Sequence, residues 1–219
     1  MAPISWQRLR AARDRAAARW PSPFRLPLVK RPSDVLYAAL AGRERLLDVG
    51  SGDSTRRERL AARFPGVRYV SVDPDIAARA DHLRVADASG VFDAAILFET
   101  LEHLPPQDGI ALLAQTRAKL APHGRIFVSV PCIHTPGRFQ RDCTHVTPWA
   151  HDELGAALTL AGFEPVAMHR TYPGTALGRL VRRAVLGPIG HAFGIDYAYS
   201  VVATAVVTAQ ATGVAAGAD

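Results

Sequence analysis

Short apolar runs alternate with stretches of helical periodicity along most of the chain. Buried parallel strands are continuously apolar, and covering helices repeat their apolar positions every three to four residues. The alternation therefore predicts an α/β domain with helices on both faces of a mainly parallel sheet. We expect strands at 45–49, 68–72, 82–86, 92–98, 124–130, 163–170 and 197–208, and helices at 4–20, 33–42 (capped by Ser33), 55–64, 107–120, 151–161 and about 174–195.

The first 31 residues differ from the rest in charge. They hold eight basic side chains and one acidic one, in a chain of 219 residues whose formal net charge is +6, so the remainder is close to neutral. We therefore expect a basic N-terminal arm (1–31), a domain (32–208) with a helical insert at about 174–195, and a flexible tail (209–219). The arm or the insert could contact a membrane surface, and the insert could instead be a lid or a homodimer contact.

The composition narrows the class of protein. Hydrophobic residues make up 48% of the chain, enough for one domain with a full core. Two cysteines imply no disulfide framework. The sequence has neither an apolar run of membrane-spanning length nor a signal-peptide pattern, so we expect a cytoplasmic protein.

The first candidate for chemistry is the turn after the strand at 45–49. There Asp48 precedes Gly50, Ser51 and Gly52. Glycine has no Cβ and lets the backbone come close to a ligand, although a purely structural turn is the alternative. A dinucleotide fingerprint needs a third glycine three residues on, where this chain has Thr55, which disfavours a nicotinamide cofactor.

Acidic residues end the next two expected strands. Asp73 follows the strand at 68–72, and Asp87 follows the strand at 82–86. The carboxyl ends of parallel strands meet at one edge, where open α/β sheets bind their ligands. We expect Asp73 to accept hydrogen bonds from ribose hydroxyls and Asp87 to accept one from an exocyclic amine. The alternatives are a turn cap for Asp73 and an ordinary loop position for Asp87.

These segments carry a family resemblance. LLDVGSGDS, YVSVDPD, RVADAS, FDAAILFETLEHL and GRIFVSVP, followed by D-x-T-H, E-L and A-G-F, make the chain similar to class I S-adenosylmethionine-dependent methyltransferases of the small-molecule branch. The pattern departs at Ser54, where that family more often has glycine. The resemblance implies a Rossmann-like, doubly wound, mostly parallel seven-stranded sheet with its last strand antiparallel, and S-adenosylmethionine as cofactor. Carried over by position, the cofactor would lie against Asp48, Gly50, Ser51, Gly52, Asp73, Asp87, Ala88, Phe98 and Glu99.

Candidate catalytic residues follow the strand at 124–130. A hydroxyl acceptor needs a base, and histidine acts near neutral pH, so we take His145 as the base with Asp142 as its partner and His134 as a further candidate. A loop held by hydrogen bonds is the alternative. Two Cys-x-His pairs, beginning at Cys132 and Cys143, allow a zinc site, and Asp142 with a histidine allows Mg²⁺ or Mn²⁺. We expect no resident metal, and His103 reads as structural.

The leading function is methyl transfer from S-adenosylmethionine to a small molecule, at a hydroxyl of a sugar, a lipid-linked glycan or another metabolite. A non-catalytic, cofactor-binding partner subunit is the alternative. An NAD(P)-binding oxidoreductase and an RNA methyltransferase are less favoured, because a third glycine and an RNA-binding motif are lacking. We therefore expect no nucleic-acid partner.

Overall fold

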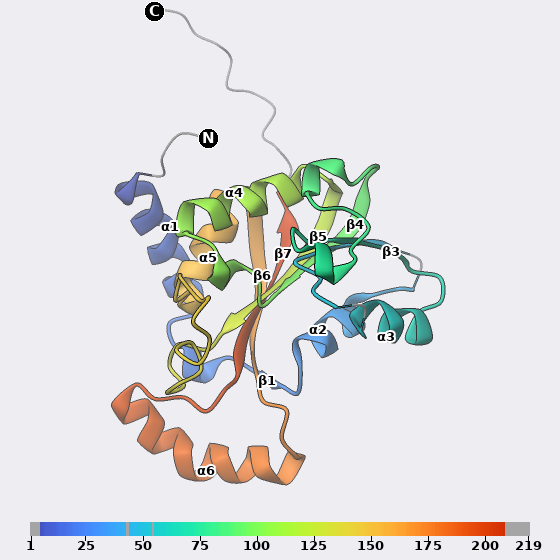
Figure 1. Cartoon of the computed structure of the whole chain (residues 1–219). Coiled ribbons are helices and arrows are strands. Elements are labelled where there is room, and N and C mark those ends of the chain that lie inside the picture. Colours follow the sequence, from blue (N-terminus) through green and yellow to red (C-terminus); the bar gives the residue numbers. More distant parts are fainter. Residues whose placement is uncertain (1–4, 43, 54, 209–219) are drawn as a thin grey trace, which may run out of the picture.

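The protein is built on one seven-stranded sheet (Figure 1). The computed structural model describes residues 5–42, 44–53 and 55–208. The strand order is β1-β6-β7-β5-β4-β2-β3, and only β7 runs antiparallel to its neighbours. This confirms the predicted mostly parallel α/β sheet with an antiparallel last strand. The strands are β1 (Leu28–Val29), β2 (Arg45–Val49), β3 (Arg68–Val72), β4 (Phe92–Phe98), β5 (Leu120–Pro131), β6 (Phe163–Thr171) and β7 (Ser200–Val207).

Helices cover both faces of the sheet. Successive side chains of a strand point to opposite faces, so Leu46 of β2 joins one apolar cluster and Leu47 joins the other. The Leu46 cluster includes side chains of α2 and α3, and the Leu47 cluster includes side chains of α4 and α5. The α-helices are α1 (Trp6–Arg19), α2 (Pro32–Ala39), α3 (Thr55–Arg63), α4 (Pro106–Arg117), α5 (His151–Leu160) and α6 (Ala176–Phe193).

The prediction of a strand at 82–86 is wrong. Its only ladder contact is an isolated bridge between His82 and Val72, and a short 3-10 helix covers Val85–Asp87. The Asp81 carboxylate accepts the backbone N–H of Ser71 at 2.8 Å. A side chain thus occupies a backbone donor of β3 that a neighbouring strand would use. The seventh strand is instead β1, paired with β6 at the other edge of the sheet.

The cap expected for the helix at 33–42 is also wrong. Arg31 is the N-cap residue, and Pro32 takes the first helical position. The Asp34 carboxylate accepts the backbone N–H of Arg31 at 2.9 Å. Proline fits the first turn because its nitrogen has no hydrogen to leave unpaired.

The helix of the predicted basic arm packs on α5. Ala12 and Ala16 of α1 are buried, and the Arg13 Nε atom lies 2.7 Å from the Asp152 carboxylate. The backbone carbonyl of Trp20 lies 2.9 Å from the ring of His151. Residues 1–31 therefore include a helix fixed to the domain by burial and charge. The tail predicted at 209–219 lies outside the described residues.

The close packing of α1 on α5 can be tested at Gly155. A Cβ at Gly155 would lie 2.8 Å from the Cβ of Ala16. Leucine at this position should push α1 away, and overpacking of this kind costs about 1–3 kcal/mol. We expect Gly155→Leu to lower the free energy of unfolding by that amount in urea titrations, and Ala16→Gly to restore part of the loss. Unchanged stability of the single variant would contradict the packing.

The segment expected as a helical insert forms α6. It connects the carboxyl end of β6 to the start of β7, so it lies toward the carboxyl edge of the sheet, apart from the other helices in Figure 1. Among the described residues, no helix combines the length and the apolar character that a bilayer crossing requires. Membrane contact and dimer formation through α6 stay predictions. Its exposed apolar side chains include Leu177, Leu180, Val181 and Val185.

Candidate functional site

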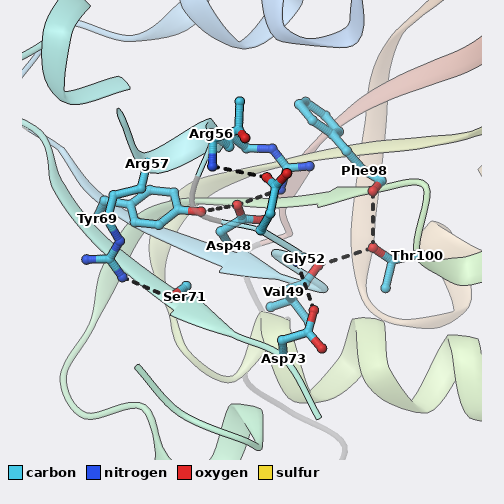
Figure 2. Close-up of polar contacts among 12 residues, drawn as sticks. Asp48, Val49, Gly52, Arg56, Arg57, Tyr69, Ser71, Asp73, Phe98 and Thr100 are labelled. Atoms are coloured by element: carbon cyan, nitrogen blue, oxygen red, sulfur yellow. Dashed lines mark hydrogen bonds and ion pairs between the residues drawn. The ribbon is translucent and has the colours of Figure 1, made fainter. Parts of the chain in front are cut away.

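The glycine turn lies against the end of β3. Gly50 and Gly52 have positive φ angles of 73° and 58°, a conformation that side chains disfavour. The Gly52 N–H donates to one oxygen of the Asp73 carboxylate at 2.9 Å, and the Asp75 N–H donates to the other oxygen at 2.9 Å. Figure 2 shows the first of these bonds, which ties the turn after β2 to the acid after β3. Two of the predicted site features are thus in direct contact.

Thr100 closes the turn from the side of β4. Its hydroxyl lies 3.3 Å from the carbonyl of Val49 and 3.3 Å from the carbonyl of Phe98 (Figure 2). A Cβ added at Gly50 would lie 2.4 Å from that hydroxyl oxygen. The ends of β2, β3 and β4 are therefore held together by short polar contacts, and glycine is the residue that fits at position 50.

The edge beside the turn is hollow. A cavity of about 200 Å³ is lined by Ser51, Gly52 and Asp53 on one side and by Ala77 and Arg79 on the other. A Cβ at Gly52 would meet no atom within 4 Å, so the turn leaves open space in front of its backbone. Ile76, at the start of the short helix after Asp73, is 79% exposed. An exposed apolar side chain three residues beyond a carboxylate suits a flat, partly apolar ligand such as a nucleoside base.

Asp48 has a different place from the one expected. Its side chain is fully buried, and its two carboxylate oxygens lie 2.6 and 2.5 Å from one nitrogen of Arg56. The hydroxyl of Tyr69 also donates to this carboxylate (Figure 2). Burial raises the pKa of Asp48, while Arg56 and Tyr69 favour its charged form. In this geometry Asp48 anchors the start of α3 to β2 and β3 beneath the turn.

Asp87 and Ala88 lie apart from the hydrogen bonds of the turn. The Asp87 carboxylate pairs with Arg84 at 3.0 Å, and its exposure leaves it open to solvent. Arg84 lowers the pKa of Asp87 through these bonds. The Ala88 side chain is buried in the core. Contact of either residue with adenine stays a prediction.

Glu99 occupies a strained position directly after β4. Its φ angle is 54°, which is uncommon for a residue other than glycine. Its N–H donates to the carbonyl of Ser129 at 3.0 Å, and the Ser129 hydroxyl donates to the Glu99 carboxylate at 2.7 Å. Burial raises the pKa of Glu99. Backbone strain that neighbouring strands hold in place is typical of functional positions. The residue before Glu99 is Phe98, whose ring lies under the guanidinium of Arg56.

Asp142 and His145 are brought together as expected, but not as an orienting pair. The His145 Nδ1 atom lies 2.7 Å from the carbonyl of Phe139, so that nitrogen carries the hydrogen. The Asp142 carboxylate lies 3.9 Å from the other nitrogen, Nε2. His134 instead lies against the ring of Phe24, and burial lowers the pKa of His134. A joint catalytic role of His134 with the other two has no support in these contacts.

The sequence analysis did not identify Glu102 as a site residue, and it interpreted His103 as a structural residue. Glu102 is wholly buried, and neither of its carboxylate oxygens has a hydrogen-bond partner among the described residues. One of these oxygens lies 4.0 Å from His145 Nε2, and the rings of His103 and His145 are 4.9 Å apart. Burial, with the nearby Glu99, raises the pKa of Glu102 to about 8. The available signal was the segment Glu99-Thr100-Leu101-Glu102-His103, which puts two acids and a histidine after a strand.

The cysteines do not build the zinc site that their spacing allowed. Cys132 is buried with its sulfur 3.9 Å from the Asp196 carboxylate, whereas Cys143 is exposed. In the part of the chain that the structure describes, one group of three metal-ligating side chains converges, namely Glu102, His103 and His145.

Comparison with solved structures gives the same fold. A methyltransferase from Archaeoglobus fulgidus, described as S-adenosylmethionine-dependent, aligns with a TM-score of 0.57 at 14% identity over 90% of this chain and 94% of its own. The 1,6-didemethyltoxoflavin-N1-methyltransferase of Burkholderia thailandensis, solved with S-adenosylhomocysteine, gives 0.55 at 23% over 95% and 93%. The N-methyltransferase NodS of Bradyrhizobium japonicum, also solved with S-adenosylhomocysteine, gives 0.55 at 14% over 82% and 86%. No curated protein matches the chain in sequence.

The sheet order and the glycine turn thus match the fold of these S-adenosylmethionine-dependent methyltransferases. A family model described as a methyltransferase domain matches residues 9–168, and the chain belongs to that family. The predicted enzyme class and cofactor are confirmed at this level. The match begins inside α1, so it includes part of the segment set apart by its charge.

Proposed function

We propose that the enzyme transfers the methyl group of S-adenosylmethionine to a hydroxyl of a small molecule, such as a sugar, a lipid-linked glycan or another metabolite. The observation that carries the proposal is the Asp73 carboxylate bound to the N–H of Gly52, a residue that lines an open cavity. The second lone pair of each carboxylate oxygen is available for a ribose hydroxyl. S-adenosylmethionine supplies an already activated methyl group.

The chain's own residues would then bind and align the reactants. Gly50, Ser51 and Gly52 present backbone to the cofactor, and Ile76 gives its base an apolar surface. Asp48 supports the turn indirectly, because its carboxylate binds Arg56 and so anchors the start of α3. Alignment and exclusion of water are the main requirements of a transfer whose leaving group is already activated.

The acceptor would meet the loop after β5. His145 is suited to act as a base on a hydroxyl, because its Nδ1–H donates to the backbone carbonyl of Phe139 and Nε2 therefore keeps a lone pair. Glu99 and Phe98 lie between this loop and the glycine turn along the strand edge, where the sulfonium end of the cofactor would be placed. The exposed apolar side chains of α6 at the same edge favour an acceptor with an apolar part.

A binding measurement tests the cofactor site. We expect Asp73→Ala to weaken S-adenosylhomocysteine binding at least tenfold in isothermal titration calorimetry, because the variant loses both the ribose acceptor and the support of Gly52. Asp93→Ala is the matched control, since Asp93 stands at the opposite end of β4, where its carboxylate accepts the Arg45 N–H. Equal affinity of Asp73→Ala and wild type would contradict the assignment.

Turnover separates the enzyme from a non-catalytic partner subunit. Release of S-adenosylhomocysteine should rise when hydroxylated acceptors are added to wild-type protein with S-adenosylmethionine. Mass spectrometry of the product then distinguishes oxygen from nitrogen or carbon methylation. Tight cofactor binding with no methylated product across sugars, glycans and phenols would favour the partner-subunit alternative.

A further inference from the structure

Glu102, His103 and His145 form a cluster that the cofactor roles above do not use. Each offers one ligand atom, and the three atoms lie within 4.8 Å of one another. Glu102 comes from the 3-10 helix after β4, and His145 comes from the loop after β5. The cluster therefore stands at the carboxyl edge of two adjacent central strands, close to Glu99.

The hydrogen bonds around the two histidines fix which nitrogen is free. The Thr144 hydroxyl gives its one hydrogen to Asp142 at 2.6 Å, so at its 2.9 Å contact it accepts from His103 Nδ1. His145 Nδ1 gives its hydrogen to the Phe139 carbonyl at 2.7 Å. Both rings thus keep the lone pair on Nε2. Histidine ligands of metals are oriented in this way, by donation from the ring nitrogen that does not bind the metal.

Glu102 is the acidic member of the cluster. Its carboxylate is fully buried, both of its oxygens lack a hydrogen-bond partner, and no Lys or Arg of the described residues forms an ion pair with it. The ionised form of a buried carboxyl group is costly unless a partner compensates its charge, and carboxylates that are ionised inside proteins are paired or coordinate a metal. A bound cation would satisfy both oxygens and the two histidine lone pairs together.

We propose that Glu102, His103 and His145 hold a divalent cation with mixed nitrogen and oxygen preference, such as Mn²⁺, Fe²⁺ or Zn²⁺. Two imidazoles and one carboxylate suit these ions and leave coordination positions open. A further donor is the Asp142 carboxylate, whose second oxygen lies 3.9 Å from His145 Nε2. The ligand atoms need only small side-chain shifts to reach the usual bond lengths of about 2.0–2.3 Å.

The role of the cation rests on the proposed function. An acceptor hydroxyl bound to the ion has a lowered pKa and gives its proton to the Asp142 carboxylate, and from there to solvent. The oxygen then attacks the methyl carbon as the carbon–sulfur bond breaks, which yields the methyl ether and S-adenosylhomocysteine. In this arrangement His145 binds the cation instead of acting as the base. Acceptors with two neighbouring oxygens, as in a diol or a catechol, would fill two open positions.

Direct metal binding tests the site without any acceptor. Untagged full-length protein, freed of metal by a chelator, is titrated with Mn²⁺ in electron paramagnetic resonance and with Zn²⁺ in calorimetry. We expect one ion per chain. Loss of even an outer partner of a metal ligand costs about 10–100-fold in affinity, so Glu102→Gln and His145→Gln should each weaken binding more than tenfold. Glu164→Gln is the matched control, because its side chain is exposed and distant in the sheet.

Each outcome decides the proposal. Absence of Mn²⁺ and Zn²⁺ binding to the wild type overturns it, as does unchanged binding by Glu102→Gln. If Glu102→Gln fails to fold, His103→Gln at the exposed member of the cluster decides in its place. S-adenosylhomocysteine binding is measured in parallel and should stay within a few-fold of wild type in all three variants. If the wild-type protein does not bind S-adenosylhomocysteine, the result contradicts the proposed function. If it binds S-adenosylhomocysteine but no metal, the result contradicts this metal site alone.

Discussion

Replacing Arg56 with methionine is expected to lower the free energy of unfolding by about 3–5 kcal/mol. Asp48 is fully buried, and Arg56 lies 2.5 Å from its carboxylate. Without the guanidinium, the carboxylate keeps only the hydroxyl of Tyr69 as a side-chain hydrogen-bond partner among the described residues. Removing one member of a buried pair leaves an uncompensated charge, which costs far more than the net value of the pair. Guanidinium chloride titrations followed by circular dichroism measure the loss.

The neighbouring residue gives the matched control. Arg57 binds Asp81, but the two side chains are 41% and 39% exposed, so Arg57→Met should cost less than about 1 kcal/mol. The double variant Asp48→Asn/Arg56→Met removes both charges and should recover more than half of the loss caused by Arg56→Met. A loss below 1 kcal/mol in Arg56→Met would show that the buried carboxylate is compensated in another way.

The pH dependence of this variant has a definite sign. Burial already raises the pKa of Asp48 above its ordinary value of 3.8, and loss of Arg56 should raise it further. A group with a raised pKa in the folded state favours folding below the unfolded value and loses that contribution as the pH rises through the folded value. The destabilisation by Arg56→Met should therefore be smaller at pH 4 than at pH 7. A loss that is the same at both values would exclude Asp48 as its source.

Most of the fold could be predicted because apolar periodicity is a local property. The strands at 45–49, 68–72 and 92–98 begin and end in the structure where the pattern placed them. The expected strand at 82–86 failed because its backbone role at the edge of β3 is taken by the side chain of Asp81. β1 was missed because two residues beside a proline carry no pattern of their own, and only pairing with β6 defines it.

The candidate site was predictable to the extent that topology fixes it. Contact between the glycine turn and Asp73 follows from the adjacency of β2 and β3 in a parallel sheet. Pairing of Asp48 with Arg56 could not be read from spacing, because an acid before a glycine turn looks the same whether it faces a ligand or a helix. Glu102 was missed for a related reason, since only the three-dimensional structure shows that its carboxylate is buried with no hydrogen-bond partner among the described residues.

Gly50→Ala is expected to weaken S-adenosylhomocysteine binding more than a hundredfold while the protein stays folded. Two costs combine at this position. The φ angle of 73° costs a residue with a Cβ about 1–2 kcal/mol. The added carbon would also lie 2.4 Å from the Thr100 hydroxyl oxygen and 2.5 Å from its methyl group. The turn must then move away from β4, which carries the Gly52 N–H away from Asp73. Calorimetry measures the affinity, and circular dichroism checks the fold.

A second glycine separates the two costs. Gly137 has a φ angle of 75°, and a Cβ there would meet no atom within 4 Å, so Gly137→Ala has the conformational cost without the clash. We expect this control to bind with nearly wild-type affinity. Adding Thr100→Gly to Gly50→Ala removes the atoms that the new carbon would strike, and should recover part of the binding. If Gly50→Ala alone binds within a few-fold of the wild type, the backbone of this turn does not approach the cofactor. Full loss without any recovery in the double variant would instead assign the whole effect to the backbone conformation.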